Sequence, residues 1–148
     1  MKSFKYAFHG FFETVRTQRN MRVHLCFAFY VIIAGLVTRL SALEWTSALV
    51  CIGLVTALEC LNTALESLCD TVHPEKSEGI RIAKDASAGA VLSAAIVSAV
   101  VGGIVFFNEQ KVTAAREFFK TDTTLSILII LTLIPLIIFV WGRKREMK

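Results

Sequence analysis

Charged residues are scarce in this chain of 148 residues: Asp, Glu, Lys and Arg make up 19%, whereas a soluble domain usually has about 25%. The chain also contains no C-x-x-C pair and neither of the glycine-rich phosphate loops, G-x-x-x-x-G-K-[ST] and G-x-G-x-x-G. The scarcity of charge, together with apolar residues that gather in four long stretches, excludes a disordered chain, a secreted disulfide scaffold and an ordinary soluble enzyme. A nucleotide-binding site in this chain must therefore hold the phosphates without either of these loops. The length is also too short for a large transporter with two internal halves.

Four cysteines, Cys26, Cys51, Cys60 and Cys69, lie inside apolar stretches with no histidine at metal-ligand spacing. A metal or redox role is one interpretation. We favour the other, in which they are small thiols buried in helices.

Apolar residues dominate, at 55% of the chain with a mean hydropathy of +0.61, and they gather in four long stretches. This pattern predicts an all-α membrane protein with spans at about residues 23–38, 45–70, 85–107 and 125–141, the last continuing into a basic tail that ends at residue 148. Arg22 and Arg39 bracket the first, short span, and we expect them to snorkel toward water. Residues 108–124 are expected to form an extracytoplasmic loop.

The first residues do not have the pattern of a signal peptide, because no small-residue cleavage site follows a short apolar region. Instead, apolar side chains recur at helical spacing on one side, at Phe4, Phe8, Phe11, Phe12 and Val15. This pattern predicts an amphipathic helix over residues 3–19 that lies on the membrane surface.

The net charge of +4 is compatible with nucleic-acid binding or with basic cytoplasmic loops, and we favour the loops. With four spans, the N-terminus, the middle loop and the C-terminus share one side, which carries twelve Lys and Arg residues against four on the other. The positive-inside rule therefore places both termini in the cytoplasm.

Acidic and polar residues form a stripe inside the second span, at Glu59, Asn62, Glu66 and Asp70. Steps of three, four and four place them on one helix face. A structural interpretation, in which hydrogen bonds join neighbouring helices, suits only Asn62 and the adjacent Thr63. Three acids repel one another unless a cation lies between them, so we favour a functional site.

Basic residues follow directly in the loop H-P-E-K-S-E-G-I-R-I-A-K, residues 73–84. They are compatible with an ordinary cytoplasmic loop. Beside the acidic stripe they resemble half of a phosphate and metal site. Small residues then open the third span and permit close helix packing, within the chain or between protomers.

Several sequence motifs in this chain resemble those of a known family. The motif E-x-x-N-T-A-x-E-x-x-x-D at residues 59–70 and K-D-x-x-A-G-A-V at residues 84–91 resemble the prokaryotic diacylglycerol kinases, which include undecaprenol kinases. The similarity continues in Y-A-x-x-G at residues 6–10 and R-N-x-R-x-H at residues 19–24, and covers roughly residues 4–107.

The resemblance implies a bacterial inner-membrane homotrimer that transfers the γ-phosphate of ATP, with Mg²⁺ or Mn²⁺, to a lipid hydroxyl at the cytoplasmic interface. Glu59 is then the general base, Glu66 holds the metal at the ATP phosphates, and Asn62 and Asp70 support the site. The ATP contacts that the resemblance implies are Tyr6, Gln18, Glu66, Glu75, Lys76, Ser77, Lys84 and Asp85. It implies no nucleic-acid partner.

Two departures from the family stand out. Gln18 occupies a position where the family usually has a metal-binding Glu, and an amide ligates through its oxygen without contributing charge. The chain from residue 108 onward, with its fourth span, lies outside the three-span core, and we expect it to serve packing or anchoring.

Three functions are compatible with these features: a lipid kinase acting on undecaprenol or diacylglycerol, a catalytically inactive kinase-like scaffold, and a small cation transporter or channel. The transporter does not need the basic loop. The motif around Asn20 and His24, together with N-T-A at residues 62–64, tilts the prediction toward undecaprenol by analogy.

Overall fold

The computed structural model describes residues 2–72 and 77–142 of the chain. These residues form seven helices and no strand, which confirms the all-α prediction. In chain order the helices are α1 (Lys2–Thr17), α2 (Arg19–Val37), α3 (Ala42–Val72), α4 (Glu78–Phe106), α5 (Glu109–Thr121), α6 (Thr123–Leu131) and α7 (Leu133–Trp141).

Four helical segments are long and apolar enough to cross a membrane: α2, α3, α4 and the combined stretch Thr123–Trp141. Helices α3 and α4 are longer than the spans expected from the sequence. With 31 and 29 residues they rise about 46 and 43 Å, well beyond a hydrocarbon core of about 30 Å. Their polar ends therefore project past the membrane core.

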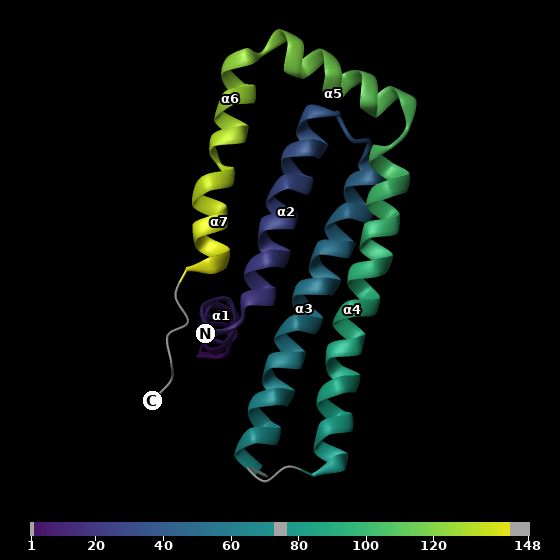
Figure 1. Ribbon diagram of the computed structural model, residues 1–148. Helices are drawn as coiled ribbons and strands as arrows, with labels where there is room; N and C mark the ends of the chain where they lie inside the picture. Colours follow the sequence, from purple (N-terminus) through teal and green to yellow (C-terminus); the bar gives the residue numbers. More distant parts are fainter. Residues whose placement is uncertain (1, 73–76, 143–148) are drawn as a thin grey trace.

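The spans lie side by side, with α3 packed most extensively on α4, and with α2 between α3 and α7 (Figure 1). Helix α1 is viewed along its axis in Figure 1 and so lies across the bundle, beside the ends of α2 and α7. Helix α5 crosses the opposite end. The start of α1, the end of α3, the start of α4 and the end of α7 therefore share one end of the bundle, as four spans require.

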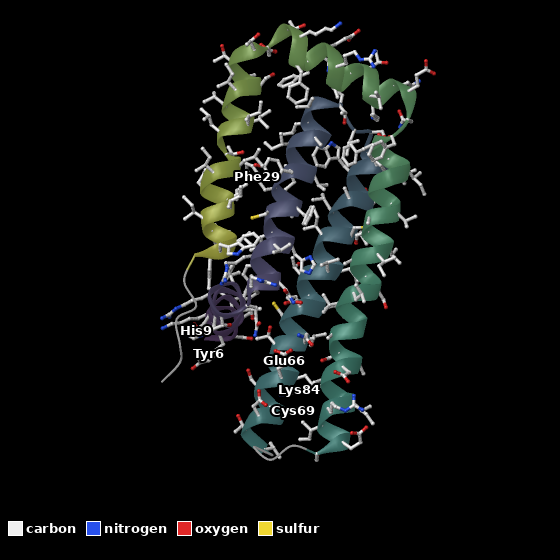
Figure 2. All side chains as sticks on the ribbon, in the orientation of Figure 1. Tyr6, His9, Phe29, Glu66, Cys69 and Lys84 are labelled. Atoms are coloured by element: carbon white, nitrogen blue, oxygen red, sulfur yellow. The ribbon has the colours of Figure 1, made fainter. Side chains whose placement is uncertain are left out.

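Helix α1 keeps most of its aromatic side chains uncovered by the rest of the chain. Phe4, Phe8 and Phe12 are exposed, as is Tyr6, which lies on this helix with His9 (Figure 2). An uncovered apolar face on a helix that lies across the bundle suits the predicted position on a membrane surface. That position stays a prediction.

Two helix boundaries differ from the sequence-based expectations. Residues 109–121, expected as a loop, form α5, whose Asn108 cap accepts a hydrogen bond from the Lys111 N–H at 3.0 Å. An acidic residue in the first turn and a basic one in the last further favour the helix. The surface helix ends at Thr17 rather than at residue 19, because Gln18 adopts an extended conformation and begins α2 as its cap.

The fourth span is interrupted at Thr132, between α6 and α7. Pro135, in the first turn of α7, has no N–H to donate and its ring clashes with the carbonyl of Leu131, which accounts for the break. The Thr132 hydroxyl lies 3.0 Å from that of Tyr30 and so links the interrupted helix to α2.

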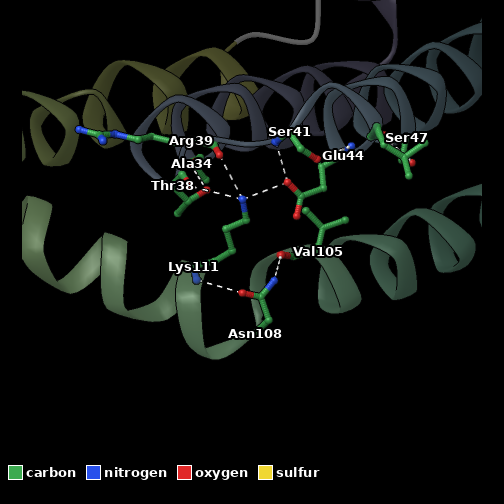
Figure 3. Close-up of polar contacts among 10 residues, drawn as sticks. Ala34, Thr38, Arg39, Ser41, Glu44, Ser47, Val105, Asn108 and Lys111 are labelled. Atoms are coloured by element: carbon green, nitrogen blue, oxygen red, sulfur yellow. Dashed lines mark hydrogen bonds and ion pairs between the residues drawn. The ribbon is translucent and has the colours of Figure 1, made fainter.

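Lys111 fastens α5 to the turn between α2 and α3 (Figure 3). Its Nζ donates to Glu44 Oε2 at 2.9 Å and to the carbonyls of Arg39 and Thr38 at 3.1 and 3.4 Å. Arg39 has a φ of 53°, which reverses the chain tightly enough to present both carbonyls on the same side. The segment after the third span is thereby joined to the core at the end of the bundle opposite α1.

Candidate functional site

The polar stripe of α3 runs from the interior of the bundle to its surface. Glu59 is 2% exposed and Asn62 6%, Glu66 is half-buried, and Asp70 is exposed. From Glu59 to Asp70 the helix rises about 16 Å, which is half the thickness of a hydrocarbon core. The stripe therefore connects a buried carboxylate to the aqueous end of the α3–α4 pair, where Figure 2 shows Glu66 and Lys84.

Glu59 lines a cavity of about 260 Å³ between α2, α3 and α4. Three other polar side chains line the same cavity, namely Asn20, His24 and Asn62. An acid at such a depth is costly unless it serves a function, because insertion of a carboxylate at mid-membrane costs about 2.5–3.5 kcal/mol. Its position next to a cavity leaves room for a small polar group of a substrate.

Asn62 is held by hydrogen bonds on both sides. Ser87 of α4 donates to Asn62 Oδ1 at 2.6 Å, and Asn62 Nδ2 donates to Glu66 Oε1 at 3.2 Å. A carboxylate oxygen accepts from an amide, so the amide nitrogen faces Glu66 and the amide oxygen is left to accept from the Ser87 hydroxyl. These two linked hydrogen bonds orient the Glu66 carboxylate, in line with the supporting role expected for Asn62.

Acids of α3 meet a cation of α4 at the outer end of the stripe. Lys84 Nζ forms an ion pair with Asp70, fourteen positions away in sequence. Arg81 pairs within its own helix, with Asp85 at 2.9 Å and with Glu78 at 2.5 Å. Both cations lie on the part of α4 that projects beyond the membrane core, where a phosphate group can reach them.

The remaining predicted residues lie in three places. Tyr6 is exposed on α1, and Gln18 lies at the α1–α2 junction, where its side chain makes no capping hydrogen bond. The Ser77 hydroxyl caps α4 by accepting from the Ile80 N–H at 3.3 Å, which gives this residue a structural role. Glu75 and Lys76, both predicted ATP contacts, lie outside the described residues.

No group of three or more His, Cys, Asp and Glu side chains within residues 2–72 and 77–142 is arranged to hold a metal ion. Magnesium is usually held by one or two carboxylates together with substrate phosphates and waters, so it needs no such cage. The Glu66 carboxylate, oriented by Asn62 and near the end of the bundle, fits that mode of binding.

Sequence reasoning gave no site role to Ser87, Asn20 or His24. Asn20 and His24 are four positions apart on α2 and therefore face the same cavity. Their motif is visible in the sequence, but only the packing of α2 on α3 and α4 shows what it faces. A second, apolar cavity of about 280 Å³ shares Val23, His24 and Ala95 with the Glu59 cavity and continues it toward α5.

The fold and the site together define a small all-helical membrane protein that gathers acids and cations at one end of its bundle, below a buried carboxylate. The chain belongs to the prokaryotic diacylglycerol kinase family, whose sequence model matches residues 5–106. The four apolar helices and the family match together indicate a bacterial membrane protein.

Two curated relatives are similar to this chain. An undecaprenol kinase from Bacillus subtilis is 40% identical over 105 residues, which are 71% of this chain and 85% of the relative. A diacylglycerol kinase from Synechocystis is 45% identical over 102 residues, which are 68% of this chain and 58% of the relative. No solved structure matches the chain.

Proposed function

We propose that this protein is an ATP-dependent lipid kinase that phosphorylates the terminal hydroxyl of undecaprenol at the cytoplasmic face of the inner membrane. The observation that carries the proposal is the buried Glu59 at the inner end of a stripe that leads to the paired Asp70 and Lys84. The undecaprenol kinase relative, matched over 85% of its length, supports the choice of lipid. Diacylglycerol is the alternative acceptor.

In the proposed reaction the lipid hydroxyl enters the cavity beside Glu59, whose carboxylate accepts its proton. The hydroxyl oxygen then bonds to the γ-phosphorus of ATP, the bond from that phosphorus to the β-bridging oxygen breaks, and ADP leaves. A general base of this kind contributes about 10²–10⁴-fold to a rate. The remaining catalysis is positioning and charge neutralisation, which phosphoryl transfer mainly requires.

The nucleotide is proposed to lie at the outer end of the stripe, with its triphosphate directed inward past Glu66 so that the γ-phosphate reaches the hydroxyl beside Glu59. Lys84, now paired with Asp70, turns to the phosphates, and Asp85, Tyr6 and Ser77 lie around the nucleotide. Magnesium bound with ATP supplies neutralisation of the phosphate charge, and Glu66 and Gln18 are the residues that would hold it. Gln18 brings no charge to that task, so metal binding rests on Glu66.

The proposed assembly is a homotrimer. Helix α4 carries Ser93, Val97 and Val100 exposed on its surface, and large apolar side chains are exposed along α3 and α4. Small and apolar residues of this kind pack against lipid or against a neighbouring protomer.

The test is phosphorylation by the purified protein in lipid nanodiscs, with ATP and either undecaprenol or diacylglycerol. We expect phosphate on undecaprenol, with a higher kcat/KM than for diacylglycerol and with dependence on added Mg²⁺. Faster phosphorylation of diacylglycerol would replace the acceptor and leave the kinase assignment intact. No phosphorylation of either lipid would favour the inactive scaffold.

A further inference from the structure

Arg22 is buried at the junction of three helices, although the sequence suggested that it snorkels to water. It is 7% exposed, and its guanidinium donates to three backbone carbonyls: Val15 at 3.2 Å, Arg16 at 3.1 Å and Val140 at 3.4 Å. No carboxylate within residues 2–72 and 77–142 pairs with it. A buried cation must be partnered, and here backbone oxygens are the partners.

Two of these carbonyls belong to the end of the surface helix. Helix α1 ends at Thr17, so its last carbonyls have no partner within the helix. The Gln18 N–H takes the Thr14 carbonyl at 2.8 Å, and the Nη1 group of Arg22 takes the next two, those of Val15 and Arg16. A cation at this position also complements the negative end of the helix dipole.

The third carbonyl belongs to the end of the fourth span. Helix α7 ends at Trp141, and the Gly142 N–H takes the Ile138 carbonyl at 2.5 Å. The Nε group of Arg22 reaches the Val140 carbonyl from α2, across 118 positions of sequence. Val140 is itself buried and lies outside the residues 5–106 that match the family.

Arg22 also lies in the same turns of α2 as two residues of the Glu59 cavity. Asn20 and His24, two positions before and after it, line that cavity, while Met21 beside it is fully buried. Helix α1 contacts α3 as well as α2. A shift at the α1–α2 junction would therefore move the cavity wall and the surface helix together.

We propose that Arg22 is a positioning residue, which caps the ends of α1 and α7 at once and so makes the fourth span part of the support of the active site. This proposal rests on the proposed function, because the surface helix matters to the reaction through Tyr6 and Gln18 at the nucleotide. The fourth span then has a role beyond anchoring: the Val140 carbonyl completes the set of acceptors that holds Arg22 over α1.

The planar guanidinium is needed for this role. It donates from two nitrogens in different directions, to α1 through Nη1 and to α7 through Nε. A lysine carries a similar charge on a single nitrogen and cannot reach both helix ends in that geometry. We therefore expect Arg22→Lys to preserve part of the capping and Arg22→Met to remove all of it.

The test measures backbone hydrogen exchange and kinetics on the full chain in nanodiscs. In Arg22→Met, amides in the last turns of both α1 and α7 should exchange at least tenfold faster, with Arg22→Lys in between. The matched control is Arg19→Met, which removes an exposed arginine of the same helix and should leave exchange at both ends unchanged. The KM for ATP should rise about tenfold in Arg22→Met, with a smaller change in kcat.

Each outcome decides the proposal. Unchanged exchange, or faster exchange in α1 alone, would overturn the link to the fourth span. Faster exchange in both helices with an unchanged KM for ATP would overturn the positioning role. If Arg22→Met does not fold, Arg22→Lys provides the same comparison. Because exchange is read without turnover, a wild-type protein that phosphorylates no lipid refutes the proposed function while leaving the link between α1 and α7 measurable.

Discussion

Replacement of Glu59 by Gln separates the chemical role of the carboxylate from its structural effect. The substitution keeps the size of the side chain and one acceptor oxygen, and removes its ability to accept a proton. Turnover should fall about 10²–10⁴-fold, which corresponds to about 2.7–5.4 kcal/mol of transition-state stabilisation. The KM for ATP should change little, because the substitution leaves the proposed nucleotide contacts at Lys84 and Asp85 and the proposed metal contact at Glu66 in place.

The stability of Glu59→Gln should not fall with its turnover and should stay equal to that of the wild type or exceed it. Glu59 is 2% exposed, and Glu66 follows it on the same helix face after seven residues, or about 10.5 Å of rise. At that separation two carboxylates repel by on the order of 1 kcal/mol in an effective dielectric of about 20. A neutral amide at position 59 removes this repulsion and the cost of burying a charge, so the variant should be at least as stable as the wild type.

The assay compares initial rates of lipid phosphorylation with the melting temperature in the same detergent. Glu44→Gln serves as the matched control, because it makes the same change at the opposite end of α3, where Glu44 pairs with Lys111. That variant should keep its activity and melt at a lower temperature, the reverse of Glu59→Gln. Turnover of Glu59→Gln within a few-fold of the wild type, at equal oligomer content, would falsify the assignment of the base.

Three further predictions concern metal, topology and the extension. Gln18→Glu should lower the Mg²⁺ concentration that gives half-maximal phosphorylation and change the rate little at saturating metal, and superimposable titrations would remove Gln18 from the site. In a background without native cysteines, Arg116→Cys should react with a membrane-impermeant maleimide in intact cells and Lys5→Cys only after lysis, whereas external labelling at position 5 would reverse the orientation. Lys111→Met should lower the melting temperature and speed exchange in α5, unlike the exposed Lys120→Met, and equal effects of the two would contradict the role of the ion pair.

Local pattern was enough to predict the spans and the stripe. The hydropathy of an apolar run is a property of that segment alone and does not depend on what packs against it. The four apolar runs therefore predicted all four spans. The spacing of Glu59, Asn62 and Glu66 places them on one face of any α-helix, whatever packs against it. The family followed from the same residues, and a match over residues 5–106 confirms it.

The sequence also carries signals for the break at Thr132 and for helix α5, which the pattern of apolar and polar stretches does not predict. Pro135 interrupts an apolar run, and Asn108 followed by an acidic residue is a helix-start pattern. The first signal is a single residue and the second is a short polar pair. Both stand beside long apolar stretches, whose pattern is far stronger. The polarity of residues 108–124 by itself predicts a loop.

Contacts between distant segments were decided only by the tertiary structure. The hydrogen bond from Ser87 to Asn62 depends on how α4 packs on α3, and the same two side chains are compatible with many other partners. Arg22 is the clearest case, because its acceptors are backbone carbonyls, which every residue carries alike. Composition and spacing thus determined which segments enter the membrane and which face of α3 is polar, whereas the burial of Arg22 between the ends of α1 and α7 arose from packing, since no side chain in the sequence marks which carbonyl oxygen will lie within its reach.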